Sequence, residues 1–284
     1  MASDHGPLAG AGLDRPSLFG LAGLAGLLGL STLALAGAPW KVLVVSWAAF
    51  GAMAGCAVLG ARTAGGDAVR LVWGYGLASG AMVTSAAVFL LPQAVGFDAA
   101  VGGFGVAAGL VGGYSGHTVG HRLSHRDAFD SAPAQLTAHS LSAGAIIGLV
   151  YAALPELGLL LGLAIVSHKG PAGYAAARRL GDADRSMGVL LLPSSGVGLT
   201  AVPAALLQPP STPAVNAAIF GFAAGVFLHV AMDFLPECEV GGEVSEAAGV
   251  DGHAHARLDR LRVHAVASTL GGALAVALAW LLVA

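Results

Sequence analysis

Nine stretches of about 20 predominantly apolar residues, bounded by charged residues, proline or turn residues, follow one another along this chain of 284 residues. A bilayer hydrocarbon core about 30 Å thick needs that many helical residues to cross it, and only helices or closed barrels satisfy their backbone groups there. The sequence therefore predicts an all-α, polytopic membrane helix bundle. The predicted spans are residues 18–38, 42–61, 69–91, 97–119, 133–154, 157–177, 187–207, 214–235 and 263–283.

Composition excludes several other classes of protein. Only 10% of the residues are charged, against roughly 25% in soluble domains, and 56% are hydrophobic, which excludes a soluble globular domain. The formal net charge of −3 offers no basic surface to a nucleic-acid backbone. The two cysteines are too few for a disulfide framework or a cysteine-rich zinc module. We therefore expect a lipid bilayer as the surroundings and no nucleic-acid partner.

The basic residues predict which ends of the spans face the cytoplasm, because short cytoplasmic connections accumulate Lys and Arg. With a cytoplasmic N-terminus, 11 of the 13 basic residues fall on the cytoplasmic side, Lys41 falls on the opposite side, and Lys169 lies inside a span. We therefore expect a multi-pass protein of the cell membrane with its N-terminus in the cytoplasm and its C-terminus outside. The 11 residues are Arg15, Arg62, Arg70, Arg122, Arg126, Arg178, Arg179, Arg185, Arg257, Arg260 and Arg262.

The first predicted span has an alternative interpretation. The small residues at 34–38 resemble a signal-peptide cleavage site, although the apolar run before them is long for a signal peptide. Cleavage there would leave eight spans with the same topology. We divide the chain into residues 1–41, an N-terminal tail with an extra transmembrane helix, and residues 42–284, the main helical unit.

Five ionisable residues stand out inside the predicted spans, where an ionisable side chain is expensive and is a functional candidate by default. They are His139, the adjacent His168 and Lys169, and the pair His229 and Asp233. Imidazole binds zinc, copper, iron or nickel far better than magnesium or calcium. The histidines therefore favour a transition-metal ion as the ligand.

Two local patterns add to this interpretation. His229, Asp233 and Glu237 recur every four residues, so they share one helix face that can line a path. The pair Gly170-Pro171 follows His168, and proline removes a backbone donor and kinks a helix. Transporters commonly hold ions at such kinked or broken helices.

Structural alternatives exist for each of these features. His229 and Asp233 could simply pair with each other, as polar residues do between packed transmembrane helices. The long stem of Lys169 could reach the membrane interface. We assign the glycine-rich faces of residues 102–113 to close helix packing rather than to a binding loop.

Further histidines lie in the predicted cytoplasmic regions. His117, His121 and His125 are spaced by four residues, which allows neighbouring members to chelate a metal ion if the helix continues. His253 and His255 lie in another cytoplasmic connection and could bind metal weakly. Solvated histidines without a metal are the equally open alternative.

Four short motifs occur in order after residue 42. They are SAAVFLLPQ at 85–93, His139-Ser140 with Gly144, His168-Lys169-Gly170, and FAAGVFLHV at 222–230 followed by FLPE at 234–237. In these motifs and in their order, the chain resembles the ZIP family of zinc and iron permeases from roughly Val42 to the C-terminus. The resemblance implies an eight-helix transport domain at 42–284, preceded by one extra helix.

The resemblance also implies a metal site between the fifth and sixth predicted spans. His139 and His168 are the implied ligands, with Ser140 as a third oxygen donor. Lys169 occupies a position that is a carboxylate in dinuclear members, so its charge would replace a second metal ion there. Asp233, one turn after His229, is the best supplier of negative charge.

The chain departs from the family pattern at two positions. Ala143 stands where the family has an acidic residue before the glycine, and Pro171-Ala172-Gly173 stands where some branches have Pro-His-Glu. Two neutral imidazoles leave a dication poorly compensated. We therefore expect weak affinity unless another helix supplies charge.

The expected function is ZIP-type transport of a divalent transition metal, Zn²⁺ or a similar ion, into the cytoplasm. The metal is the substrate, no cofactor is implied, and the protein is not an enzyme. A ZIP-fold protein that has lost transport and acts as a metal sensor or interaction partner is the alternative, and a homodimer is left open. An intramembrane hydrolase is disfavoured, because no His-Glu-x-x-His segment occurs and Asp233 is the lone candidate base.

Overall fold

The computed structural model describes residues 15–35, 40–62, 68–124, 131–156, 159–182, 185–207, 209–210, 212–236, 238, 244 and 255–283. All the regular secondary structure in these residues is helical, including a π-helix, η1, and a short 3₁₀ helix, η2. The first elements are α1 (Arg15–Leu35), α2 (Trp40–Arg62), α3 (Ala68–Ser85), η1 (Ala86–Leu90), α4 (Leu91–Phe97) and α5 (Ala99–Ser124). The next are α6 (Ser131–Ala153), α7 (Leu159–Val166), α8 (Lys169–Asp182), η2 (Met187–Leu190), α9 (Leu191–Ala205), α10 (Pro213–Asp233) and α12 (His255–Val283).

Seven helical segments in the described part of the chain are long and apolar enough to cross a membrane. The prediction of a polytopic helical membrane bundle is thereby confirmed, whereas the total of nine spans stays a prediction. Of the remaining two predicted spans, 97–119 falls mainly in α5, which has eight glycines among its 26 residues, and 157–177 is divided between α7 and α8. The seven segments are Ser17–Leu35, Trp40–Arg62, Ala68–Phe97, Leu136–Ala153, Met187–Ala205, Pro213–Asp233 and Leu258–Leu282.

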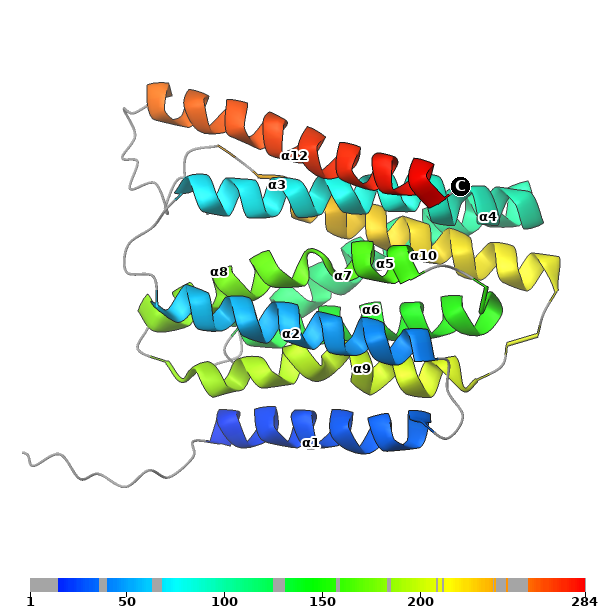
Figure 1. Ribbon diagram of the computed structural model, residues 1–284, viewed down its shortest axis with the longest axis horizontal. Coiled ribbons are helices and arrows are strands. Elements are labelled where there is room, and N and C mark those ends of the chain that lie inside the picture. Colours follow the sequence, from blue (N-terminus) through cyan, green and yellow to red (C-terminus); the bar gives the residue numbers. More distant parts are fainter. Residues whose placement is uncertain are drawn as a thin grey trace, which may run out of the picture.

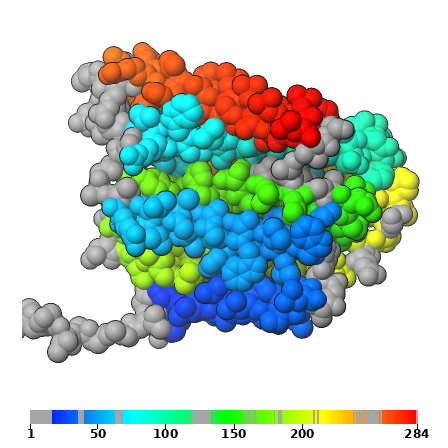
Figure 2. Space-filling view, in the orientation of Figure 1, coloured from blue at the N-terminus to red at the C-terminus, as the bar shows by residue number. Residues whose placement is uncertain are grey.

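The helices pack into two groups. In the first helix group, α9 packs against α1, α2 and α6, and α2 packs against α8. In the second helix group, α10 packs against α5 and α4, and α3 packs against α12. Contacts between the groups are less extensive and join α6, α7 and α8 to α3, α5 and α10. Figures 1 and 2 show α1 along one edge of the bundle and α12 along the opposite edge, with α2 and α3 between them.

Glycines allow α5 and α10 to approach each other closely. A Cβ atom at Gly109 would overlap the carbonyl oxygen of Phe222, and one at Gly225 would overlap the carbonyl oxygen of Val106. Such close backbone approach between membrane helices depends on small residues. Gly103, in the same helix, has no atom within 4 Å of its Cβ position, so only part of the glycine-rich region serves this packing.

Substituting Gly109 with alanine should destabilise the protein, because the added methyl group meets the backbone of α10. We expect Gly109→Ala to cost about 1–3 kcal/mol and to lower the melting temperature of the purified protein in detergent. The matched control is Gly103→Ala, whose Cβ enters open space. Equal melting temperatures for the two variants would contradict this packing.

Candidate metal site

A helix break between α7 and α8 positions the candidate site. Residues 167–168 form a turn, and the carbonyl oxygen of His168 accepts the first backbone hydrogen bond of α8, from the N–H of Ala172 at 3.1 Å. Pro171 lies in the first turn of α8, where its missing N–H is least costly, and it cannot donate to the carbonyl of Ser167. The sequence predicts a kinked but continuous helix here, whereas the structure has two helices that part just before Lys169.

His139 on α6 and His168 at this break lie in direct contact. Their Nε2 atoms are 3.0 Å apart, and their rings are T-shaped, with centroids 5.2 Å apart. The side chain of His168 is fully buried. At this distance the two nitrogens share one hydrogen, because neutral imidazole donates through one nitrogen and accepts through the other.

The spacing of the two nitrogens fits joint binding of one metal ion. Two imidazoles bound to tetrahedral Zn²⁺, each with a Zn–N bond of about 2.05 Å, have nitrogens about 3.3 Å apart. The observed 3.0 Å separation is close to this value. A metal ion could therefore replace the shared hydrogen after a small adjustment of the rings.

Lys169 and Ser140 form a second contact beside the histidine pair. Lys169 Nζ donates a hydrogen bond to Ser140 Oγ at 2.9 Å, and both side chains are buried. The lysine therefore stays inside the bundle, which contradicts the alternative in which its stem reaches the interface. The hydroxyl predicted as a third metal ligand has the ammonium group as its partner. Two hydrogen bonds, His139–His168 and Lys169–Ser140, thus join α6 to the break between α7 and α8.

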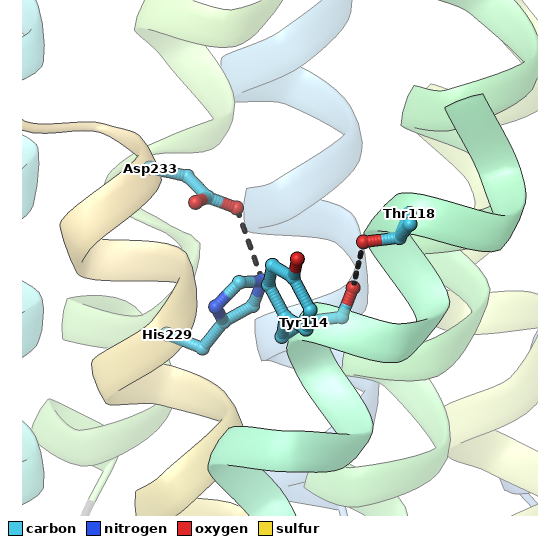
Figure 3. Close-up of polar contacts among 4 residues, drawn as sticks. All are labelled: Tyr114, Thr118, His229 and Asp233. Atoms are coloured by element: carbon cyan, nitrogen blue, oxygen red, sulfur yellow. Dashed lines mark hydrogen bonds and ion pairs between the residues drawn. The ribbon is translucent and has the colours of Figure 1, made fainter. Parts of the chain in front are cut away.

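His229 and Asp233 form a separate pair on α10. His229 Nε2 and Asp233 Oδ2 are 3.3 Å apart, and the ring of Tyr114 on α5 lies edge-on to His229 (Figure 3). Gly113 leaves room for this imidazole, because a Cβ there would meet the ring at 2.6 Å. The predicted common face of His229 and Asp233 is therefore correct, while Glu237 lies outside the described residues.

Phe234 links the end of α10 to the histidine pair. Its ring centroid is 5.2 Å from that of His168 and 5.4 Å from that of Tyr75 on α3. These two ring contacts therefore connect Tyr75 and Phe234 of the second helix group to His168 of the first. The sequence analysis did not identify Tyr75, Phe234 or Tyr114 as site residues. Of the three, Phe234 could have been suspected, because it directly follows Asp233 in the sequence.

The predicted ligands fall into two pairs. Among the described residues, no three His, Cys, Asp or Glu side chains lie close enough together to hold one metal ion. Ala143, where the resemblance implies a carboxylate, and Ala172, where it implies a histidine in some branches, are each 4% exposed and lie four residues after His139 and His168. Four residues are about one helical turn, so Ala143 lies on the same face of α6 as His139, whereas Ala172 lies in the first turn of α8, after the break that contains His168. The side chains of the remaining predicted ligands lie outside the described part of the structure: His117, His121, His125, His253 and His255.

A comparison with models of protein families finds no match to the chain, and a search of curated proteins also finds none.

Zn²⁺ binding to the purified protein should depend on the histidine pair. Because one of two imidazole ligands is removed, His139→Ala should weaken Zn²⁺ binding by about tenfold or more in a calorimetric titration. His264→Ala is the matched control, because the His264 ring accepts a hydrogen bond from Trp73 on another pair of helices. Equal Zn²⁺ affinities for wild type and His139→Ala would exclude the pair as the binding site.

Proposed function

We propose that the protein is a ZIP-type transporter that moves a divalent transition-metal ion, Zn²⁺ or a similar ion, into the cytoplasm. The observation that carries the proposal is the 3.0 Å approach of the His139 and His168 Nε2 atoms inside an apolar helical bundle. Two imidazoles directed at one point favour a transition metal over magnesium or calcium. The helix break at His168 supports transport, because broken membrane helices commonly line ion sites.

The two helix groups supply a route for alternating access. His139 on α6 and His168 at the break just before α8 belong to the first helix group, whereas Phe234 belongs to the second, at the end of α10. The contacts between the groups are the less extensive ones. Movement of the first group against the second would carry the bound ion past Phe234. Asp233, beside Phe234, supplies negative charge along this route.

The proposed orientation in the membrane rests on the distribution of basic residues, whereas inward transport is what the resemblance to the ZIP family implies. Eleven of the 13 lie on the side that the positive-inside rule assigns to the cytoplasm. The proposed topology has a cytoplasmic N-terminus and an external C-terminus in the cell membrane.

Zn²⁺ uptake into proteoliposomes tests the proposal directly. We expect saturable uptake by the wild-type protein and background uptake by the His139→Ala, His168→Ala double variant, because the ion loses both ligands. Cd²⁺, Mn²⁺ and Fe²⁺ run in parallel identify the preferred ion. The control is His264→Ala, which should transport like wild type. Unchanged uptake by the double variant would refute the assignment.

A second candidate function is metal sensing by a protein that has lost transport. The observation in its favour is the pair of buried alanines, Ala143 and Ala172, where the resembling family carries metal-binding side chains. Zn²⁺ binding by well-folded protein without measurable flux would favour this function.

Adding a carboxylate next to His139 should strengthen binding. In Ala143→Glu the new side chain lies one turn from His139 on the same helix face and contributes the missing negative charge. We expect Zn²⁺ affinity to rise about tenfold or more, as one added charge–charge contact in a buried site can provide. Ala143→Gln has the same shape without the charge, so equal affinities for the two variants would contradict this interpretation.

A further inference from the structure

Lys169 and Ser140 have buried hydrogen-bond donors without acceptors among the residues that the structure describes. Lys169 is 1% exposed, and its one hydrogen-bond partner among the described residues is the Ser140 hydroxyl. An ammonium group has three N–H donors, so two of them have no acceptor there. Ser140 is fully buried and accepts the lysine bond, and its own O–H has no acceptor among the described residues.

The described carboxylates do not balance the charge of Lys169. Within the described part of the chain, no carboxylate forms an ion pair with Lys169, and the one described aspartate near the site, Asp233, pairs with His229. A buried ammonium is strongly unfavourable without a counter-charge. Placing a dication on His139 and His168 would add two more positive charges beside it.

The start of α8 adds to the positive potential. Lys169 and Gly170 are the first two residues of this 14-residue helix, and the backbone N–H groups of a first helical turn have no partners within the helix. The N-terminal end of a helix carries partial positive charge, which makes it a poor position for a lysine and a good one for an anion. Because the Cα–Cβ bond of a helical residue tilts toward the N-terminus, the Lys169 side chain extends toward this end.

We propose that the site takes up a small inorganic anion, such as chloride, together with the metal ion. The Lys169 ammonium and the Ser140 hydroxyl bind the anion, and His139 and His168 bind the metal beside it. The anion lies between two cationic groups and compensates both of them. This inference rests on the proposed transport function and makes the transported unit a metal ion with its counter-anion.

The experiment compares Zn²⁺ uptake into proteoliposomes in chloride and in gluconate, a bulky organic anion, at equal pH and ionic strength. Valinomycin and potassium clamp the membrane potential, so that chloride does not act by charge compensation across the bilayer. We expect uptake to be about tenfold or more faster in chloride, a ratio typical of a buried charge pair. Radioactive chloride should enter together with the metal.

Two substitutions separate the anion site from general damage. Lys169→Gln removes the charge, so uptake by this variant should be equal in the two anions. Lys169→Arg is the matched control that keeps the charge, and it should keep the preference for chloride. Ser140→Ala removes one donor and should reduce the preference.

A melting experiment makes the result independent of transport. In detergent with Zn²⁺ present, chloride should raise the melting temperature of the wild type relative to gluconate, because a ligand stabilises the folded state to which it binds. Lys169→Gln should lose this difference. Equal uptake in the two anions, with Zn²⁺ transported, would overturn the anion site and leave the proposed function intact. Absence of Zn²⁺ uptake in every anion would refute the proposed function, and the chloride effect on melting would then decide the anion site alone.

Discussion

The cost of holding ionisable side chains inside an apolar helical bundle is the constraint on which the rest of this structure depends. His168 and Lys169 are buried at the break between α7 and α8, and each has a polar partner on α6. Polar groups in such surroundings persist only where hydrogen bonds or charges compensate them. The double contact of 139–140 with 168–169 therefore ties the break to α6 and keeps both imidazoles directed at one point.

The hydrogen bonds between α6 and the α7–α8 break bear on how the two helix groups could move relative to each other. His139 and His168 both lie within the first helix group, so movement between the groups would leave the pair intact. In the second helix group, close glycine contacts join α5 to α10, and the ring of Phe234, which also contacts Tyr75, lies against His168. Under the proposed function, an ion bound to this pair would change its surroundings without losing its ligands, as alternating access requires.

The sequence predicts the helical membrane architecture well, because long apolar runs allow few other structures. It also identifies five ionisable residues inside the predicted spans, since such residues are rare there, and the structure buries three of them, His168, Lys169 and His229. Proline and glycine indicate an irregular helix near His168, but the position and extent of the break depend on tertiary contacts of Lys169 and His168. The contact between His139 and His168 joins residues 29 positions apart on different helices, and no local pattern determines such a distance.

For the remaining site residues, the sequence predicts contacts within one helix but not contacts between helices. Helical periodicity brings His229 and Asp233 together because they lie four residues apart on one helix. It contains no information on the approach of Phe234 to His168 or on the bond from Lys169 to Ser140, which depend on how separate helices cross. Those contacts carry much of the chemistry, because they decide which charges are compensated.

X-ray absorption spectroscopy of the Zn²⁺-loaded protein tests the central claim most directly, because it reports the atoms that surround the metal. The account predicts two imidazole nitrogens at about 2.0–2.1 Å from zinc in the wild type, and the loss of this signal in the His139→Ala, His168→Ala variant. A zinc environment without imidazole in the wild type, or the same imidazole signal in the double variant, would contradict it.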